Sequence, residues 1–240
     1  DAAAAVAAAE QAGRKADESD LLRLADAYQR TGNNAGNIST LEKLLTQYPK
    51  KDYWNAYLGR LQRKPGFSDR FTLDVMRLRL SQGLISKGDD YFEMAQLALQ
   101  ADQPAEAKAI MDKGFAAKVL GTGSDADRHK RLAELAEKKL KEGGKGMLDG
   151  LQEAEGAKDG NHLAKIGVGM IGVGKLDQGV PMLEKAIAKG GLKRPEDAKL
   201  RLGLAQIQSG NRSKGVQTLR SVGGTEGAAE IARLWLMTGA

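Results

Sequence analysis

The sequence contains no cysteine and only two histidines among its 240 residues, and aromatic residues make up 5% of it. Without cysteine, the chain has no disulfide framework, no thiolate metal site and no cysteine nucleophile. The two histidines, His129 and His162, leave little for zinc binding or for the common forms of acid–base catalysis. No apolar run approaches the roughly 20 residues that a membrane-spanning helix needs, and the mean hydropathy is −0.44. These absences favour a soluble, ordered protein without a metal centre.

The hydrophobic residues follow a helical period through most of the chain. Leu21, Leu24 and Tyr28 recur on one helical face, and Leu132 and Leu135 begin a similar pattern further on. No stretch alternates apolar and polar residues for long, and the Asn-Gly turns typical of β-hairpins are absent. Glycine, proline and asparagine divide the helical stretches into lengths of about 12–18 residues. The pattern predicts an all-α protein, built as a bundle or as a solenoid of helical hairpins.

Comparison of the chain with itself favours the solenoid. Residues 163–187 and 199–222 align at an offset of 36 residues. This offset pairs Gly167 with Gly203, Gly174 with Gly210, Gly179 with Gly215 and Leu183 with Leu219. Self-similarity at a fixed period of this size is typical of repeat proteins, in which each unit buries its apolar face against its neighbours.

The position of the turn between paired helices recurs at Gly32, Gly66, Asp102, Gly174 and Gly210. The successive spacings are 34, 36, 72 and 36 residues. The interval of 72 residues is two periods long and holds helical segments at 125–142 and 145–157, whose residues match the repeat poorly. We therefore predict a single domain over residues 1–240. It contains repeats at 19–49, 52–83, 88–118, 160–191 and 195–222, a degenerate repeat at 124–157 and a capping helix at 225–238.

The recurring residues resemble the tetratricopeptide repeat (TPR), with a small residue in the first helix, a large residue three positions later, glycine at the turn and alanine or glycine in the second helix. The unit near residue 19 matches at Leu21, Leu24, Ala25, Tyr28, Gly32, Leu41 and Pro49. The unit near residue 91 matches at Tyr91, Met94, Ala95, Ala98, Ala107 and Met111. Asn37 and Phe71 stand where the family prefers alanine.

The resemblance spans residues 19–222 and implies a right-handed solenoid of antiparallel helical hairpins, with about five to six repeats and a terminal capping helix. The chain as a whole is also similar to TPR-like proteins of proteobacteria, a likeness that implies no particular activity.

Two glycine-rich stretches resemble nucleotide-binding motifs but lack the context that such motifs require. Residues 167–172 read G-x-G-x-x-G, yet a turn and a helix start precede them where a dinucleotide-binding fold needs a strand. Residues 143–146, Gly-Gly-Lys-Gly, lack the Lys-Ser/Thr pair that reaches phosphate and magnesium. We interpret the first stretch as glycines that permit tight helix packing and the second as a helix-terminating linker.

The remaining polar clusters give no catalytic, cofactor-binding or metal-binding residue. Asp125, Asp127 and His129 are spaced by two, and side chains at this spacing do not gather on one helical face. We interpret His129 as a solvated residue near a helix start, and His162 as a surface residue that follows the N-cap candidate Asn161. Because no G-x-S-x-G motif and no paired catalytic carboxylates occur either, the sequence predicts a protein that is not an enzyme.

Charge is unevenly distributed along the chain, whose formal net charge is +6. Residues 60–87 and residues 193–220 each carry a net +5, whereas residues 88–127 carry −5. This distribution favours solvated helix faces, with an acidic protein partner or nucleic acid as alternatives. Because a nucleic-acid binder usually presents one basic stripe, we expect no nucleic-acid partner.

In the TPR family the first helix of each repeat lines a concave groove, and the resemblance assigns a partner-binding role to nine residues. They are Asp26, Gln29 and Arg30 in the first unit, and Ala164, Val168, Ile171, Leu200, Leu204 and Ile207 in the last two. The mapped groove is polar early in the chain and apolar late, and the late part could accept the apolar face of a peptide or helix. In the alternative, neighbouring helices or the cap bury it.

The sequence therefore predicts a non-catalytic scaffold that binds an unidentified protein or peptide and uses no cofactor. The alternatives are a self-associating structural protein and the docking arm of a larger protein whose N-terminal part lies upstream. Because the chain begins at Asp1 without a signal-peptide pattern, we expect a mature or trimmed chain. The missing thiols and the family resemblance favour a periplasmic or secreted bacterial protein, with a cytoplasmic protein as the alternative.

Overall fold

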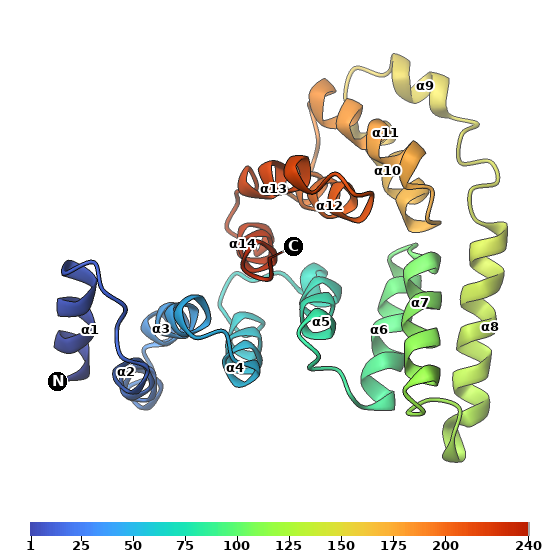
Figure 1. Cartoon of the computed structure of the whole chain (residues 1–240). Coiled ribbons are helices and arrows are strands. Elements are labelled where there is room, and N and C mark those ends of the chain that lie inside the picture. The colour runs from blue at the N-terminus through green and yellow to red at the C-terminus, as the bar shows by residue number, and fades with distance from the viewer. Residues whose placement is uncertain (240) are drawn as a thin grey trace. The chain divides into compact units, whose positions relative to one another are not determined.

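The computed structural model describes residues 1–239, and every regular element in that range is a helix (Figure 1). These residues form fourteen α-helices and two 3-10 turns, which confirms the predicted all-α class. The chain divides into two compact units, Asp1–Leu84 and the part from Ile85 onward. The division falls between the second and third predicted repeats. The single domain predicted over residues 1–240 remains a prediction.

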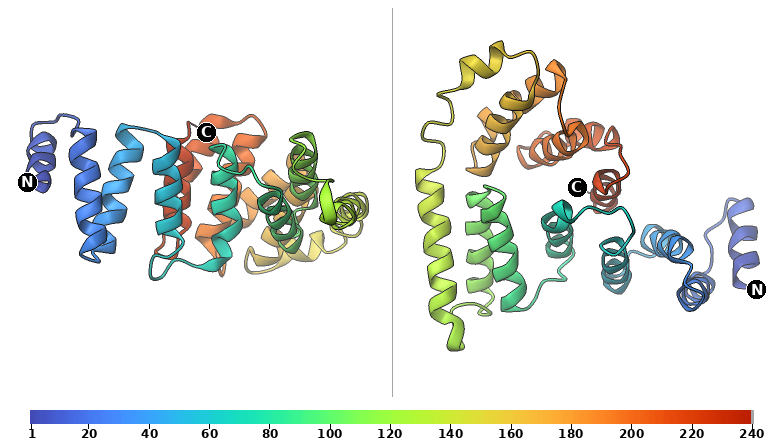
Figure 2. Two further views of the ribbon diagram at one scale, coloured as in Figure 1. Left: turned by 90° about the horizontal axis from the view of Figure 1, so that it is seen from below. Right: turned by 180° about the vertical axis from the view of Figure 1, so that it is seen from behind.

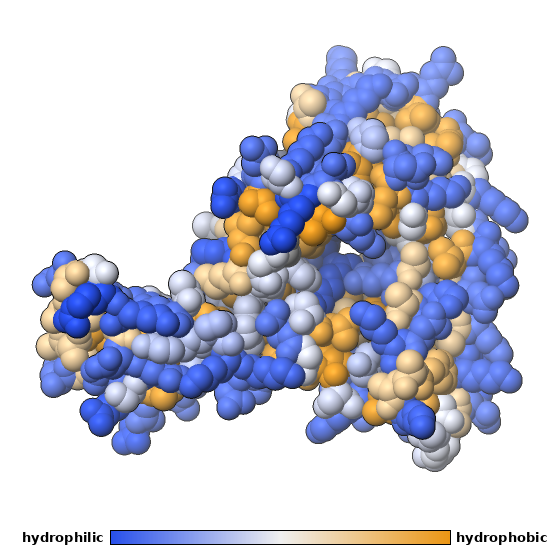
Figure 3. Space-filling view, in the orientation of Figure 1, coloured by the Kyte–Doolittle hydropathy of each residue, from blue (hydrophilic) through white to orange (hydrophobic). Residues whose placement is uncertain are grey.

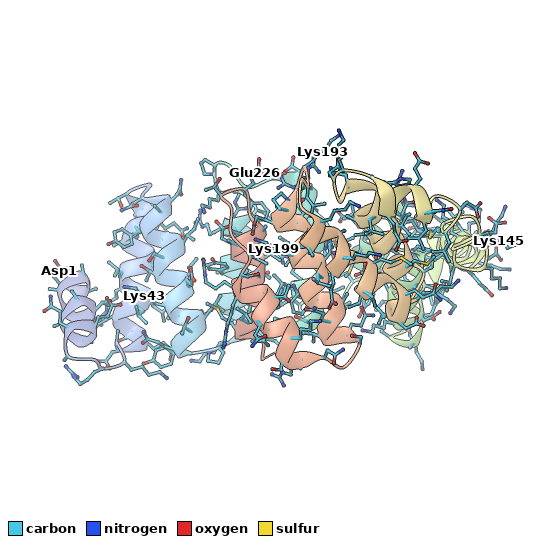
Figure 4. All side chains as sticks on the ribbon, turned by 90° about the horizontal axis from the view of Figure 1, so that it is seen from above. Asp1, Lys43, Lys145, Lys193, Lys199 and Glu226 are labelled. Atoms are coloured by element: carbon cyan, nitrogen blue, oxygen red, sulfur yellow. The ribbon has the colours of Figure 1, made fainter. Side chains whose placement is uncertain are left out.

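The first unit is a row of helices in which each packs against the next. Its elements are α1 (Ala2–Gln11), α2 (Glu18–Arg30), α3 (Asn34–Gln47), α4 (Lys51–Leu61), η1 (Asp69–Phe71) and α5 (Thr72–Ser81). A salt bridge of 2.5 Å joins Lys43 Nζ of α3 to Glu10 Oε1 of α1, and Lys43 lies on the α1 side of its helix (Figure 4). α1 packs against α2, and this salt bridge also connects it to α3.

The second unit contains two well-packed hairpins, α10 with α11 and α12 with α13. Its elements are α6 (Gly88–Gln100), α7 (Pro104–Ala116), η2 (Gly123–Asp125), α8 (Ala126–Glu142), α9 (Leu151–Gly156), α10 (Asn161–Gly172), α11 (Leu176–Lys189), α12 (Pro195–Gln208), α13 (Arg212–Arg220) and α14 (Ala228–Met237). α6, α7 and α8 lie side by side (Figure 2). α14 packs against α12 and α13 and fully buries Ile231 and Leu234, so the predicted capping segment is a helix on the last hairpin.

All five predicted turn positions adopt the left-handed backbone conformation. The φ angle is 70° at Gly32, 85° at Gly66, 56° at Asp102, 81° at Gly174 and 89° at Gly210. Glycine adopts this conformation without steric cost, and aspartate is one of the few other residues that tolerate it. Since the chain reverses at each of these residues, the predicted turn positions are confirmed.

Glycines bring the two helices of the last two hairpins into backbone contact. A Cβ atom built on Gly179 of α11 would lie 2.6 Å from the carbonyl oxygen of Gly167 in α10. A Cβ atom built on Gly215 of α13 would lie 2.7 Å from the carbonyl oxygen of Gly203 in α12. Real Cβ atoms do not approach an oxygen so closely, so both crossings depend on glycine. The G-x-G-x-x-G stretch is therefore a packing feature, as the sequence predicted.

The same pair of positions, twelve residues apart, carries other residues in two earlier hairpins. Ala95 of α6 and Ala107 of α7 are both fully buried. In the first hairpin Ala25 of α2 is paired with Asn37 of α3, whose Nδ2 donates a hydrogen bond of 2.8 Å to the Ala25 carbonyl oxygen. A buried amide thus spans a crossing that glycine or alanine closes elsewhere.

The middle of the array differs from the two-helix repeat predicted at 124–157. α8 is 17 residues long and packs against α6 and α7, whereas α9 has only six residues and packs against α10. Gly144 and Gly146 between them have φ angles of 86° and 70°, so the helix predicted from residue 145 begins only at Leu151. Each helix of this stretch joins a neighbouring hairpin instead of pairing with the other.

The substitution Gly179→Ala should lower the free energy of unfolding by about 1–3 kcal/mol, because its methyl group would meet backbone atoms of α10 that cannot move separately from the helix. The matched control is Gly156→Ala in α9, where nothing lies within 4 Å of the added Cβ. That change should be neutral or stabilise by up to about 1 kcal/mol, since alanine is the better helix former. Urea denaturation of both variants measures the difference, and equal stability would contradict the role of the crossing.

Candidate functional site

The early part of the predicted groove lies on α2 and is open to solvent. Asp26, Gln29 and Arg30 are all exposed. Arg30 Nη2 pairs with Asp26 Oδ2 at 2.8 Å, one turn earlier in the same helix. An exposed pair of this kind contributes little to stability, so it can open at small cost when a charged partner approaches.

The late part of the predicted groove lies on α10 and α12 and is mostly half-buried. Ala164, Val168 and Ile171 of α10 are partly exposed and pack against a core cluster. The members of that cluster are Val180, Leu183, Ala198, Leu202 and Ala205. The α10 residues therefore contribute to the junction between two hairpins and also retain some exposed surface.

On α12 the predicted residues differ in exposure. Leu200 is fully buried, so it belongs to the core and not to a surface. Leu204 and Ile207 are half-buried. The space-filling view shows hydrophobic residues at the surface over α10 and α11 (Figure 3). We call Val168, Ile171, Leu204 and Ile207 the apolar stripe.

A polar network around buried Gln206, which the sequence analysis missed, connects α11, α12 and α13. Gln206 of α12 is buried, and its Nε2 donates to Glu184 Oε1 of α11 at 2.8 Å. Gln206 Oε1 accepts a hydrogen bond of 2.7 Å from the Thr218 hydroxyl of α13, and Lys214 Nζ lies 2.7 Å from Glu184 Oε1. Desolvation raises the pKa of Glu184, but hydrogen bonds from Lys214 and Gln206 outweigh it and bring that pKa below its ordinary value.

His129 is buried, which corrects the interpretation of a solvated residue. It is 6% exposed, and its Nδ1 accepts a hydrogen bond of 3.1 Å from the backbone N–H of Gly121. The ring centroid of Phe92 lies 5.6 Å from that of His129. The charged residues around His129 suggested an exposed segment, but the face of α8 that carries His129 packs against the preceding helices. His162 is exposed, as predicted.

A groove of about 560 Å³ between α7 and α8 also has no counterpart in the sequence prediction. Its lining combines apolar residues, including Phe115 and Leu120, with charged side chains. The charged residues are Lys108, Asp112, Asp127, Lys130, Glu134 and Glu137. Most of them are paired, as in the 2.6 Å contact between Lys108 Nζ and Asp112 Oδ2 and the 2.7 Å contact between Lys141 Nζ and Glu137 Oε1. The groove therefore lacks the single-sign field that would select a charged ligand.

The described part of the chain holds no group of three histidine, aspartate or glutamate side chains that could bind a metal ion. Within residues 1–239, no helix combines the length and the apolar character needed to cross a bilayer.

Comparison with known families supports the hairpin array. Residues 21–51, which cover most of α2 and all of α3, match the family described as tetratricopeptide repeat. The protein is TPR-like. No curated protein matches the chain. TPR arrays generally serve as non-catalytic scaffolds for protein partners. The small residues at the crossings of this TPR-like array stand where the family has alanine or glycine.

The substitution His129→Leu should lower the free energy of unfolding by about 1–3 kcal/mol, because it keeps an apolar contact with Phe92 but leaves the Gly121 N–H without its acceptor. His162→Leu is the matched control, since His162 is exposed, and should change stability by less than about 0.5 kcal/mol. Guanidinium denaturation followed by circular dichroism measures both. A His129 variant as stable as wild type would show that the hydrogen bond does not matter.

The substitution Glu184→Gln should cost about 0.5–1 kcal/mol at neutral pH, because the charged partner of Lys214 and Gln206 is lost. The lowered pKa of folded Glu184 means that its carboxylate stabilises the fold above its ordinary pKa of 4.5, and that this contribution disappears as the pH falls through the lowered value. The difference between wild type and variant should therefore shrink on acidification. Glu134→Gln, at an exposed pair of 3.9 Å, is the control and should change stability by less than about 0.5 kcal/mol. Denaturation curves along a pH series measure both, and a difference that stayed constant would contradict the assignment.

Proposed function

We propose that this TPR-like chain is a non-catalytic scaffold that binds a protein or peptide through the apolar stripe of α10 and α12. The observation that carries the proposal is the exposure of the stripe. Four apolar side chains on the first helices of two consecutive hairpins, Val168, Ile171, Leu204 and Ile207, all keep part of their surface in solvent.

The position of the stripe supports this function. Inside each hairpin the glycine crossing closes the contact between the helices, and the Gln206 network connects α11, α12 and α13. Groups outside the stripe therefore contribute to holding the hairpins together, alongside Val168 and Ile171, which pack against the core cluster between them. An amphipathic helix that lies across α10 and α12 would cover the exposed apolar surface at intervals of three and four residues.

A protein partner fits this surface better than nucleic acid. The stripe is apolar, and base stacking needs exposed aromatic rings. Trp54 and Tyr57 are buried, and the Tyr53 hydroxyl donates a hydrogen bond to the Glu18 carboxylate. We also propose a bacterial periplasmic or secreted location, with the cytoplasm as the alternative, so extracts of the periplasm and of the cytosol serve as separate sources of partners.

The test compares tagged wild-type chain with the double variant Val168→Lys, Leu204→Lys in affinity capture from each extract at moderate salt. Lysine is chosen because its long stem lies along apolar surface while its charge reaches water, which limits damage to the fold. Proteins retained by wild type should fall at least about tenfold with the double variant, as expected when more than about 1.4 kcal/mol of apolar contact is lost. Quantitative mass spectrometry measures the ratio.

The control is Leu135→Lys in α8, which changes an apolar side chain of 43% exposure outside the stripe and should leave capture unchanged. Circular dichroism and melting temperature confirm that each variant is folded. Undiminished capture by the folded double variant would overturn the stripe as the site. If wild type retained nothing and sedimented as larger species with rising concentration, the scaffold would be a self-associating protein instead.

A further inference from the structure

The hairpin of α4 and α5 differs from the others at the point where its helices should cross. The residue equivalent to Gly167 and Gly203 is Gly59 of α4, which stands 36 residues before Ala95. A Cβ atom built on Gly167 would lie 2.9 Å from a backbone nitrogen of the second helix. A Cβ atom built on Gly59 would meet only two atoms within 4 Å, Nη2 of Arg63 at 3.7 Å and Nη2 of Arg79 at 4.0 Å. The backbone of α5 therefore does not contact α4 at Gly59, and the guanidinium groups of Arg63 and Arg79 lie nearest to this position.

The helical period arranges these groups in a row. Asn55 and Gly59 are spaced by four along α4, so they lie on one face of the helix, and Arg63 follows four residues later in the turn after α4. Arg79 reaches this face from α5, and its Nη1 donates a hydrogen bond of 2.9 Å to Asn55 Oδ1. Arg60 lies beside the row on α4, three residues before Arg63. We call Asn55, Arg60, Arg63 and Arg79 the arginine site.

The positive charges of the arginine site lack a counter-charge. Among residues 1–239, Arg60 and Arg63 make no ion pair or hydrogen bond, and the hydrogen bond of Arg79 goes to a neutral amide. Elsewhere in the same unit arginines do find carboxylates, as Arg77 does with buried Asp74 at 2.8 Å. Guanidinium groups gathered around one point repel each other, so an anion that binds between them gains their combined attraction.

We infer that the arginine site binds the carboxylates of an acidic peptide segment in a partner protein, an inference that rests on the proposed scaffold function. The planar fork of a guanidinium group matches a carboxylate through two parallel hydrogen bonds. Gly59 leaves room at the centre of the site for a ligand to approach the helix. Nucleic acid is disfavoured because Trp54 and Tyr57, the nearest large aromatic residues on α4, are buried and offer no ring for base stacking.

The test uses the full chain and a fluorescein-labelled peptide of alternating glutamate and glycine, with binding measured by fluorescence anisotropy. The decisive variant is Gly59→Asp, which places a carboxylate of the protein itself between Arg63 and Arg79. It should weaken peptide binding at least about tenfold, because the new carboxylate takes the arginine hydrogen bonds that the peptide would make. Each such charge-assisted hydrogen bond contributes about 1.5–3 kcal/mol. Its melting temperature should stay equal or rise, because the new side chain satisfies the arginines and glycine is the poorer helix former.

Two matched controls separate charge from bulk and from general electrostatics. Gly59→Ala adds the Cβ without the carboxylate and should bind the peptide like wild type. Arg23→Gln removes one positive charge from α2, outside the arginine site, and should also leave the affinity unchanged. Rising salt should weaken the binding of wild type, because the groups are partly exposed.

Peptide binding by folded Gly59→Asp at the wild-type affinity would overturn the inference, as would a wild type that does not bind the peptide. A single-stranded oligonucleotide of the same charge that bound more tightly than the peptide, and was lost in Gly59→Asp, would overturn it in favour of nucleic acid. These failures are distinct from failure of the scaffold function, because partner capture through the apolar stripe is measured in the other unit with the Val168 and Leu204 variant.

Discussion

Helices that cross with their backbones in contact have no room for a side chain at the crossing, and this steric constraint shapes the last two hairpins. Gly167 and Gly179 meet in one hairpin, and Gly203 and Gly215 meet in the next. In each hairpin the left-handed turn residue follows the first crossing residue by seven positions, which is about two helical turns. The second crossing residue follows the turn residue by five positions. The same offset of twelve separates Ala25 from Asn37 and Ala95 from Ala107 in earlier hairpins.

Contacts between hairpins are of another kind. Within a hairpin the fit is steric, whereas between hairpins an apolar core, such as the one that includes Leu183 and Leu202, is joined by polar contacts near helix ends. Glu18 of α2 accepts from Lys50 at 2.6 Å and from the hydroxyl of Tyr53 in α4. Desolvation and the Glu18 carboxylate together raise the pKa of Tyr53 to about 12, so this hydroxyl remains a donor at any physiological pH. In the second unit Asn161 of α10 makes the comparable connection, accepting from the backbone N–H of Lys193 at 2.9 Å.

The parts of the fold that local sterics determine could be predicted from the sequence. A left-handed turn favours glycine, and a close crossing requires a small residue. Gly174 therefore indicates the turn and Gly179 the crossing, whichever helices pack around them. The parts that depend on which helix packs where could not. His129 is buried because α8 packs on α6 and α7, and Leu200 is buried although the family pattern assigned it to a groove. In the same way the groove between α7 and α8 exists only because the degenerate repeat separated into two helices with different neighbours.

The residues at the crossing can differ from one hairpin to another while the turn between the helices is kept. Gly66 keeps the left-handed conformation with φ of 85°, so the chain still reverses after α4 although Gly59 meets no backbone of α5. α5 and the preceding turn η1 are held by the burial of Phe71, Val75 and Leu78 instead. In the first hairpin Asn37 fills the crossing with an amide and bonds it to the facing helix. A hairpin can therefore keep its turn without a close contact at its crossing. Where the two backbones do not meet, polar groups from the two helices can face one another at the crossing. The arginines around Gly59 are gathered at such a position, which is why a small residue there leaves space for a ligand and not for a second helix.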